Sequence, residues 1–144
     1  KPNLEGYQLS IPSLGIVAPI NSVNCADYNA YISYLNQGLI HCIGTSAPGE
    51  SGNSFIAGHS SAETRSPYES IFATLPDFPD GSEIILSHND KTYKYIGISE
   101  KIVEETDISV MNQSDDTRLT LMTCWPVGTA DKRYIVTATL AESN

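Results

Sequence analysis

The sequence predicts an all-β fold that carries two short helices. Short runs rich in β-branched residues recur between turn-forming residues, whereas helical periodicity occurs in only two places. Closely spaced strands with few helices favour a small barrel or a sandwich over alternating strand–helix units. No linker or repeat breaks the 144 residues. We therefore expect one domain over residues 1–144, long enough to bury its own core.

Six stretches carry strand signals. Glu83–Leu86 follows a Pro-Asp-Gly turn, and Thr92–Ile98 follows residues 88–91, whose composition suits a hairpin turn. Ser54–Ala57 is a short run that leads into Gly58. The other three predicted strands are rich in Ile, Leu, Val or Thr; in chain order they are Leu14–Ile20, Arg118–Thr123 and Arg133–Leu140.

Helical spacing appears twice. Apolar residues three and four apart predict one helix, with Asp27 as its N-cap and Gly38 as its stop, from Tyr28, Tyr31, Ile32 and Leu35. The same spacing predicts a second short helix that Pro76 ends, from Tyr68, Ile71, Phe72 and Leu75.

Charge and hydropathy exclude two classes of function. Eight Lys and Arg against seventeen Asp and Glu give a net charge of -9, which repels phosphate backbones, so we expect no nucleic-acid partner. No apolar run approaches the about 18 residues of a membrane span. The sequence starts at Lys1 without a signal peptide, so we expect any N-terminal membrane anchor to lie outside it.

The chain has three cysteines: Cys25, Cys42 and Cys124. At most one bridge can form within the chain, and three pairings can be written. No Cys-x-x-Cys or His-x-x-x-His spacing supports a zinc site.

Cys124 and His59 each end a predicted strand, where a side chain is held firmly yet reaches solvent. Trp125-Pro126 stops the strand after Cys124, and Gly58 precedes His59. Cys124 is a reactive thiol or a buried small hydrophobe, and buried cysteines are the commoner kind. His59 is a general acid and base beside a thiol or a structural histidine.

Arg133 opens the last predicted strand, nine residues after Cys124. If the two strands are hairpin neighbours, both side chains lie near the same loop, and the guanidinium could stabilise an oxyanion. The alternative is a surface arginine paired with a carboxylate. His41 and His88 lie in turn-like contexts, and we expect both at the surface.

Thr120-Leu121-Met122-Thr123-Cys124 resembles the Thr-Leu-x-Thr-Cys signature of sortases, the cysteine transpeptidases of bacterial cell envelopes. The resemblance continues in order over nearly the whole chain, at Ile11–Ile16, Pro48–Asn53, Phe55–Ser60, Phe72–Leu75, Asp80–Ile84 and Lys132–Val136.

The resemblance implies a closed eight-stranded β-barrel and a catalytic set. In that set, Cys124 is the nucleophile, His59 the acid and base, and Arg133 the positioning or oxyanion group. The resemblance also implies a substrate groove at Ala57, Thr120 and Thr123. Trp125 begins the next loop, where it packs on the substrate or fills core.

The resemblance implies no cofactor. Calcium-regulated sortases carry several carboxylates before the histidine strand, and only Glu50 stands there. The Thr-Cys-Trp-Pro segment looks closer to class D or E sortases. Cys25 and Cys42 lie outside the family's pattern, and a bridge between them would leave Cys124 as the free thiol.

A sortase is expected to cleave a Leu-Pro-x-Thr-Gly-like sorting motif after Thr and to pass the acyl group to an amine. Its partners would be surface proteins bearing that signal and an amine on a peptidoglycan precursor or another protein. We expect it at the extracellular face of the bacterial membrane. The alternatives are a cysteine hydrolase of the same fold and a secreted β-barrel binding module with a structural cysteine.

Overall fold

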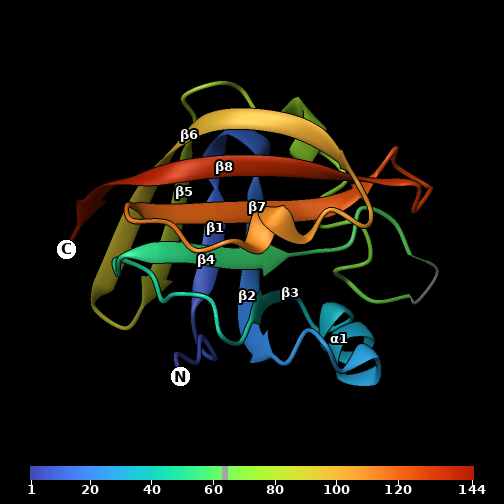
Figure 1. Cartoon of the computed structure of the whole chain (residues 1–144), viewed down its shortest axis with the longest axis horizontal. Coiled ribbons are helices and arrows are strands. Elements are labelled where there is room, and N and C mark those ends of the chain that lie inside the picture. Colours follow the sequence, from blue (N-terminus) through green and yellow to red (C-terminus); the bar gives the residue numbers. More distant parts are fainter. Residues whose placement is uncertain (63–64) are drawn as a thin grey trace.

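Eight strands pair edge to edge until the first meets the last, which makes a closed barrel in the order β1-β2-β3-β4-β7-β8-β6-β5 (Figure 1). The computed structural model describes residues 1–62 and 65–144. The predicted all-β class and the closed eight-stranded barrel are confirmed. The strands are β1 Gln8–Ile11, β2 Ile16–Val23, β3 Leu39–Cys42, β4 Gly52–Ala57, β5 Glu83–His88, β6 Lys91–Glu104, β7 Thr117–Trp125 and β8 Lys132–Ser143.

Two pairs in the barrel are parallel, β2 with β3 and β4 with β7. A parallel pair needs a crossover, and helix α1 (Tyr28–Leu35) supplies it between β2 and β3. Asp27 caps α1 as predicted, because its carboxylate accepts from the Ala30 amide at 3.2 Å. The C-terminal ends of β4 and β7 lie at the end of the barrel where α1 sits (Figure 1).

Two clusters of buried residues hold the fold. The larger fills the barrel, and alternate residues of β7, Leu119 and Leu121, point into it. The smaller lies outside the barrel, beneath α1 and the 3-10 helix η3 (Ile108–Met111) of the β6–β7 connection. Its buried members are Val23, Leu35, Ile40, Cys42, Phe55, Ala57, Val110 and Ile135. This second cluster fixes α1 and η3 over the outer face of β4 and β7.

The predicted helix at Tyr68–Leu75 is wrong. Residues 67–74 form successive turns with i to i−3 hydrogen bonds, and a 3-10 helix, η2, follows at Leu75–Asp77. Phe72 and Leu75 are nonetheless fully buried. Apolar residues three apart also share a face in consecutive turns, so the spacing reported burial correctly and the helix type incorrectly.

The prediction of surface histidines is wrong for His41, and the prediction missed β1 and β3. His41 lies in β3 and is fully buried, with Nδ1 2.8 Å from Ser22 Oγ and Nε2 2.9 Å from Thr45 Oγ1. His88 ends β5 half-buried, its ring stacked on Tyr7 with centroids 4.5 Å apart. The backbones of His41 and His88 pair with neighbouring strands, so both residues belong to strands rather than to turns.

Candidate active site

Cys124 and Arg133 face each other directly across the antiparallel β7–β8 pair. Opposite residues in such a pair have Cβ atoms about 4.5–5.5 Å apart on one face of the sheet. The hairpin relation on which the sequence argument depended is therefore present. Arg133 Nη1 donates to the carbonyl oxygens of Ala130 at 3.1 Å and Lys132 at 3.0 Å, which fixes the guanidinium beside the β7–β8 loop.

Gly58 joins the end of β4 to the end of β7. Its amide donates to the Met122 carbonyl at 3.1 Å, and the Thr123 hydroxyl donates to the Gly58 carbonyl at 2.8 Å. A Cβ at Gly58 would stand 2.5 Å from a Leu39 methyl and 2.9 Å from the Phe72 ring, so only glycine fits. These bonds hold the next residue, His59, at the end of β7 where Cys124 lies.

His59 has a partner that the sequence did not reveal. Its Nε2 lies 3.0 Å from Oδ1 of Asn36, the residue that ends α1. An amide oxygen only accepts, so Nε2 carries the hydrogen and Nδ1 is left to exchange a proton. Burial lowers the pKa of His59, and the charge of Glu69 opposes that shift. At a given pH, the neutral form of His59 is therefore more populated than that of a histidine with the ordinary pKa.

His59, Cys124 and Arg133 line one cavity of about 280 Å³ together with Ala57 and Thr123. Thus five of the seven predicted site residues meet at one place. The helix α1 forms the opposite wall and contributes Tyr28, Tyr31, Ile32 and Leu35.

Among the wall residues from α1, Tyr31 has a pKa that responds to both Cys124 and Arg133. Burial raises the pKa of its phenol, Cys124 raises it further, and Arg133 lowers it. Sequence reasoning used Tyr31 only as a helix residue, because nothing in its local pattern indicates which strand its ring faces.

A second cavity of about 400 Å³ adjoins the first and shares Tyr28, Tyr31, Met122 and Arg133 with it. Its walls are mainly apolar, and η3 closes one side. The residues that it adds include Phe55, Ile108, Val110 and Met111. Together the two cavities make a groove, which we call the β7 groove, that runs from Cys124 under η3.

A disulfide between Cys25 and Cys42 forms part of the wall of the β7 groove. The bridge ties the segment before α1 to the end of β3. Cys124 is the free cysteine. The hypothesis that Cys25 pairs with Cys42 and leaves Cys124 free is confirmed.

Two predicted groove residues lie apart from this cavity. Thr120 is buried and donates its hydroxyl to Asn53 Oδ1 at 2.7 Å, beside a separate polar cavity on the same face of β7. Trp125 ends β7 half-buried and pairs with Lys132 across the sheet.

Among residues 1–62 and 65–144, no group of three or more His, Cys, Asp or Glu side chains is arranged to hold a metal ion. Within the same residues, no helix is both long and apolar enough to cross a bilayer.

Comparison with known proteins agrees with this geometry. The Sortase domain family model matches residues 9–141. Sortase A of Listeria monocytogenes is 27% identical over 92 residues, which are 64% of this chain and 40% of that protein. The chain thus spans less than half the length of this curated relative.

Two solved structures are similar over nearly the whole chain. The sortase D5 transpeptidase of Clostridium perfringens is 25% identical with a TM-score of 0.79, covering 96% of this chain and 79% of that one. Sortase C-3 of Streptococcus pneumoniae is 27% identical with a TM-score of 0.80, covering 99% and 65%. These relatives carry the class letters A, C and D, so the likeness does not select a class. The Sortase domain model matches most of the chain, and the solved sortase structures superpose on its closed barrel. The chain therefore belongs to the sortase family.

Proposed function

We propose that this sortase is a transpeptidase that cleaves a Leu-Pro-x-Thr-Gly-like motif after Thr and transfers the acyl group to an amine. The observation that carries the proposal is the shared cavity of Cys124, His59 and Arg133 at the head of a largely apolar groove. A thiol, an imidazole and a guanidinium are the nucleophile, the proton carrier and the charge stabiliser that amide exchange needs.

The first half-reaction forms a thioester. The Cys124 thiol passes its proton to Nδ1 of His59 as the sulfur attacks the carbonyl carbon of the substrate threonine, and negative charge develops on the carbonyl oxygen. Arg133, fixed by the Ala130 and Lys132 carbonyls, stabilises that charge. The C–N bond breaks as His59 gives its proton to the departing amine, which would be a poor leaving group without it.

The second half-reaction reverses these roles. An incoming amine attacks the thioester carbonyl, His59 takes the proton that the amine releases, and the C–S bond breaks to regenerate Cys124. The lowered pKa of His59 suits this step, since it keeps the imidazole able to accept a proton near neutral pH. Asn36 acts as a positioning residue by holding Nε2–H and so presenting Nδ1.

The groove gives the substrate its place. Ala57 and Thr123 line the cavity around the acylated residue, while the apolar walls from Phe55, Val110 and Met122 suit the Leu-Pro part of the motif. In this proposal the substrates are surface proteins bearing the sorting signal, and the acceptor is an amine on a peptidoglycan precursor or another protein. The enzyme works at the outer face of the bacterial membrane.

A mass-spectrometric assay tests the proposal. Leu-Pro-x-Thr-Gly and Leu-Pro-x-Thr-Ala peptides are incubated with glycine-based or diamino-acid amines. We expect an amide product that disappears in Cys124→Ala. We expect rates lower by about 10²–10⁴ in His59→Ala and Arg133→Ala. Acid as the only product would show a hydrolase, and absence of turnover and of an acyl adduct would contradict the proposal.

Matched variants separate chemistry from folding. His88→Ala removes another half-buried imidazole, one that stacks on Tyr7 away from the cavity. Lys132→Ala removes a cation next to Arg133 in sequence that pairs with Glu104 at 2.7 Å. Both are expected to keep the activity of the unaltered enzyme.

A further inference from the structure

A third, polar cavity adjoins the β7 groove at η3. Val110 lines both this cavity and the apolar part of the groove. Residues 118, 120, 122 and 124 of β7 share the outer face of the strand, because Leu119 and Leu121, which alternate with them, lie in the cluster that fills the barrel. The polar cavity thus lies on the same face as Cys124, displaced toward the start of β7.

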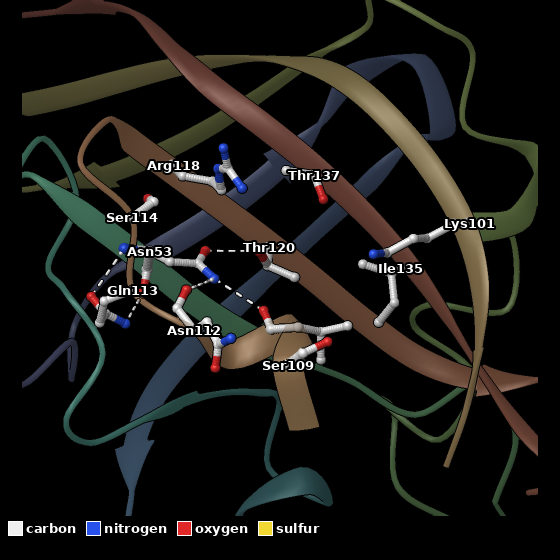
Figure 2. A pocket seen from close by; sticks show the side chains of 11 residues that line it. Asn53, Lys101, Ser109, Asn112, Gln113, Ser114, Arg118, Thr120, Ile135 and Thr137 are labelled. Atoms are coloured by element: carbon white, nitrogen blue, oxygen red, sulfur yellow. Dashed lines mark hydrogen bonds between the residues drawn. The ribbon is translucent and has the colours of Figure 1, made fainter. Parts of the chain in front are cut away.

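The polar cavity has a firmly built wall. Asn53 Nδ2 donates to the carbonyls of Val110 at 3.0 Å and Asn112 at 3.1 Å, and Asn53 Oδ1 accepts from Thr120 (Figure 2). Gln113 pairs with the backbone of Asn53 through both ends of its amide. These bonds fix the segment after η3 on β4, so the shape of the cavity is set before any ligand arrives.

Cations stand at the cavity without a carboxylate in its lining. Lys101 from β6 and Arg118 from β7 stand on opposite sides of it (Figure 2). The chain as a whole has seventeen acidic and eight basic residues. The lining, with two basic residues and no acidic one, is therefore positively charged on a molecule that is negatively charged overall. Such a cavity favours the binding of an anionic group.

Arg118 has hydrogen-bonding capacity left over. Its Nη2 lies 3.1 Å from Asp116 Oδ2, but both side chains of this pair are about two-fifths exposed, and such pairs contribute little. Its Nε is buried and has no hydrogen-bond partner among the described residues. On the other side, Asp107 is half-buried; its pKa is lowered first by its hydrogen bonds from Ser109 and only lastly by Lys101. Asp116 and Asp107 therefore leave Arg118 and Lys101 able to bind a further carboxylate.

The size of the cavity selects a side chain over a free organic ligand. Its volume is about 130 Å³, whereas sites for small organic ligands have about 300–1,000 Å³. One carboxylate with a short aliphatic stem fits such a space.

The position of the cavity selects which part of a substrate reaches it. Alternate residues of a strand are about 6.7 Å apart, so Thr120 stands about 13 Å and Arg118 about 20 Å along β7 from Cys124. An extended peptide advances about 3.3–3.6 Å per residue, so these distances correspond to four to six residues before the acylated one. In a Leu-Pro-x-Thr motif, that is one to three residues before Leu.

We propose that the cavity between Lys101 and Arg118 binds an aspartate or glutamate side chain that precedes the sorting motif, and so selects among sorting signals. The inference rests on the proposed transpeptidase function. It adds a requirement outside the motif itself: the enzyme reads charge on the segment that leads into the groove.

Paired peptides test the inference. Three peptides carry the same Leu-Pro-x-Thr-Gly motif after Asp or Glu, after Asn or Gln, or after Lys, at the three positions before Leu. We expect kcat/KM about fivefold higher for the acidic peptide than for its amide counterpart. The difference should lie in KM and shrink as salt is raised, since the contact is remote from the reacting bond.

Variants assign the preference to the cavity. The acidic-to-amide ratio is expected to fall to about one in Lys101→Gln and Arg118→Gln, and Arg118→Glu should favour the Lys peptide. Lys91→Gln, on the β5–β6 hairpin, is the control that keeps the ratio. Circular dichroism confirms that each variant is folded.

The outcomes separate the two proposals. Equal transfer of acidic and amide peptides by the unaltered enzyme overturns the inference and leaves the transpeptidase intact. If no peptide is transferred, the proposed function fails, and binding of labelled peptides to Cys124→Ala still decides the charge preference. Equal peptide binding, with inorganic phosphate perturbing the NMR signals of Arg118, would assign the cavity to a free anion and overturn the inference.

Discussion

The Cys25–Cys42 disulfide is expected to stabilise the fold and to shape the groove. The bridge closes a loop with a sequence separation of 17 and spans the whole of α1. In the chain-entropy account, a loop of this length stabilises the folded state by about 3 kcal/mol. For a domain of this size each kcal/mol corresponds to about 3–5 °C, so losing the bridge should lower Tm by about 10 °C.

The assay compares oxidised and reduced protein in a Cys124→Ala background, so that the bridge is the only redox-active group. Thermal unfolding is followed by circular dichroism with and without a thiol-free reductant. The double variant Cys25→Ala/Cys42→Ala should match the reduced protein and be insensitive to the reductant. A Tm shift smaller than about 2 °C in both tests would refute the reasoning.

The same bridge should affect substrate binding. It anchors the segment that leads into α1, and α1 brings Tyr28 and Tyr31 to the groove. With Cys124 in place, the double variant Cys25→Ala/Cys42→Ala should raise KM about threefold and leave kcat nearly unchanged, since the lost order concerns the walls of the groove rather than the reacting groups. A fall in kcat alone would contradict this assignment.

Three further predictions concern buried or partly buried polar groups. Burial lowers the pKa of His41, so the folded state binds fewer protons than the unfolded chain. The free energy of unfolding, measured in urea, should therefore be highest above about pH 6.5 and fall as the pH drops below it. His41→Gln should remove this pH dependence, and a variant that keeps it would contradict the assignment to His41. Glu69→Gln removes a charge that raises the pKa of His59, so the His59 titration measured by NMR should move to lower pH, and an unchanged or raised pKa would argue against the contact. Asn36→Ala should reduce kcat about threefold to tenfold with KM nearly constant, and Asn36→Asp, which keeps an accepting oxygen, should restore most of it; equal losses in both variants would contradict a positioning role.

The neutral state of His41 follows from its contacts as well as its burial. Thr45 Oγ1 donates to the Cys42 carbonyl at 2.7 Å, so it accepts from Nε2–H of His41. Ser22 Oγ already accepts from the Leu4 amide, and its own hydrogen can go to Nδ1. A single neutral tautomer satisfies every group, and a second ring proton would face a hydroxyl that donates toward it.

Most of the strands that the sequence predicted have a solvent-facing side or a clear turn, and the exception is β4, which is buried at every residue. Thr92–Ile98 lies within β6, and the hairpin turn before it is present, with Asn89 at a positive φ of 54°. The strand β3 was missed because its four buried residues show no alternation and because His41, a polar residue within it, resembled a turn residue. His41 looked like a turn residue because the hydroxyls that satisfy it come from distant or non-adjacent positions.

The candidate catalytic residues Cys124, His59 and Arg133 could be found in the sequence because each lies at or near one end of a strand within a recognisable local motif. The spacing of Cys124 and Arg133 correctly placed both residues beside the β7–β8 loop. Asn36 carries no such signal: its position ends a helix, and only the folded chain brings it to His59. Lys101 and Arg118 are similarly unremarkable in sequence, since their common cavity exists only after η3 closes over β4 and β7.

The most direct test of the account is the intact mass of the enzyme during turnover. After mixing with a Leu-Pro-x-Thr-Gly peptide, the unaltered protein should gain the mass of the Leu-Pro-x-Thr acyl group, with peptide mapping locating it on Cys124. Addition of an amine should remove the adduct and release the corresponding amide, and Cys124→Ala should show neither. An amide product formed by Cys124→Ala, or an acyl group found on another residue, would contradict a thioester on Cys124.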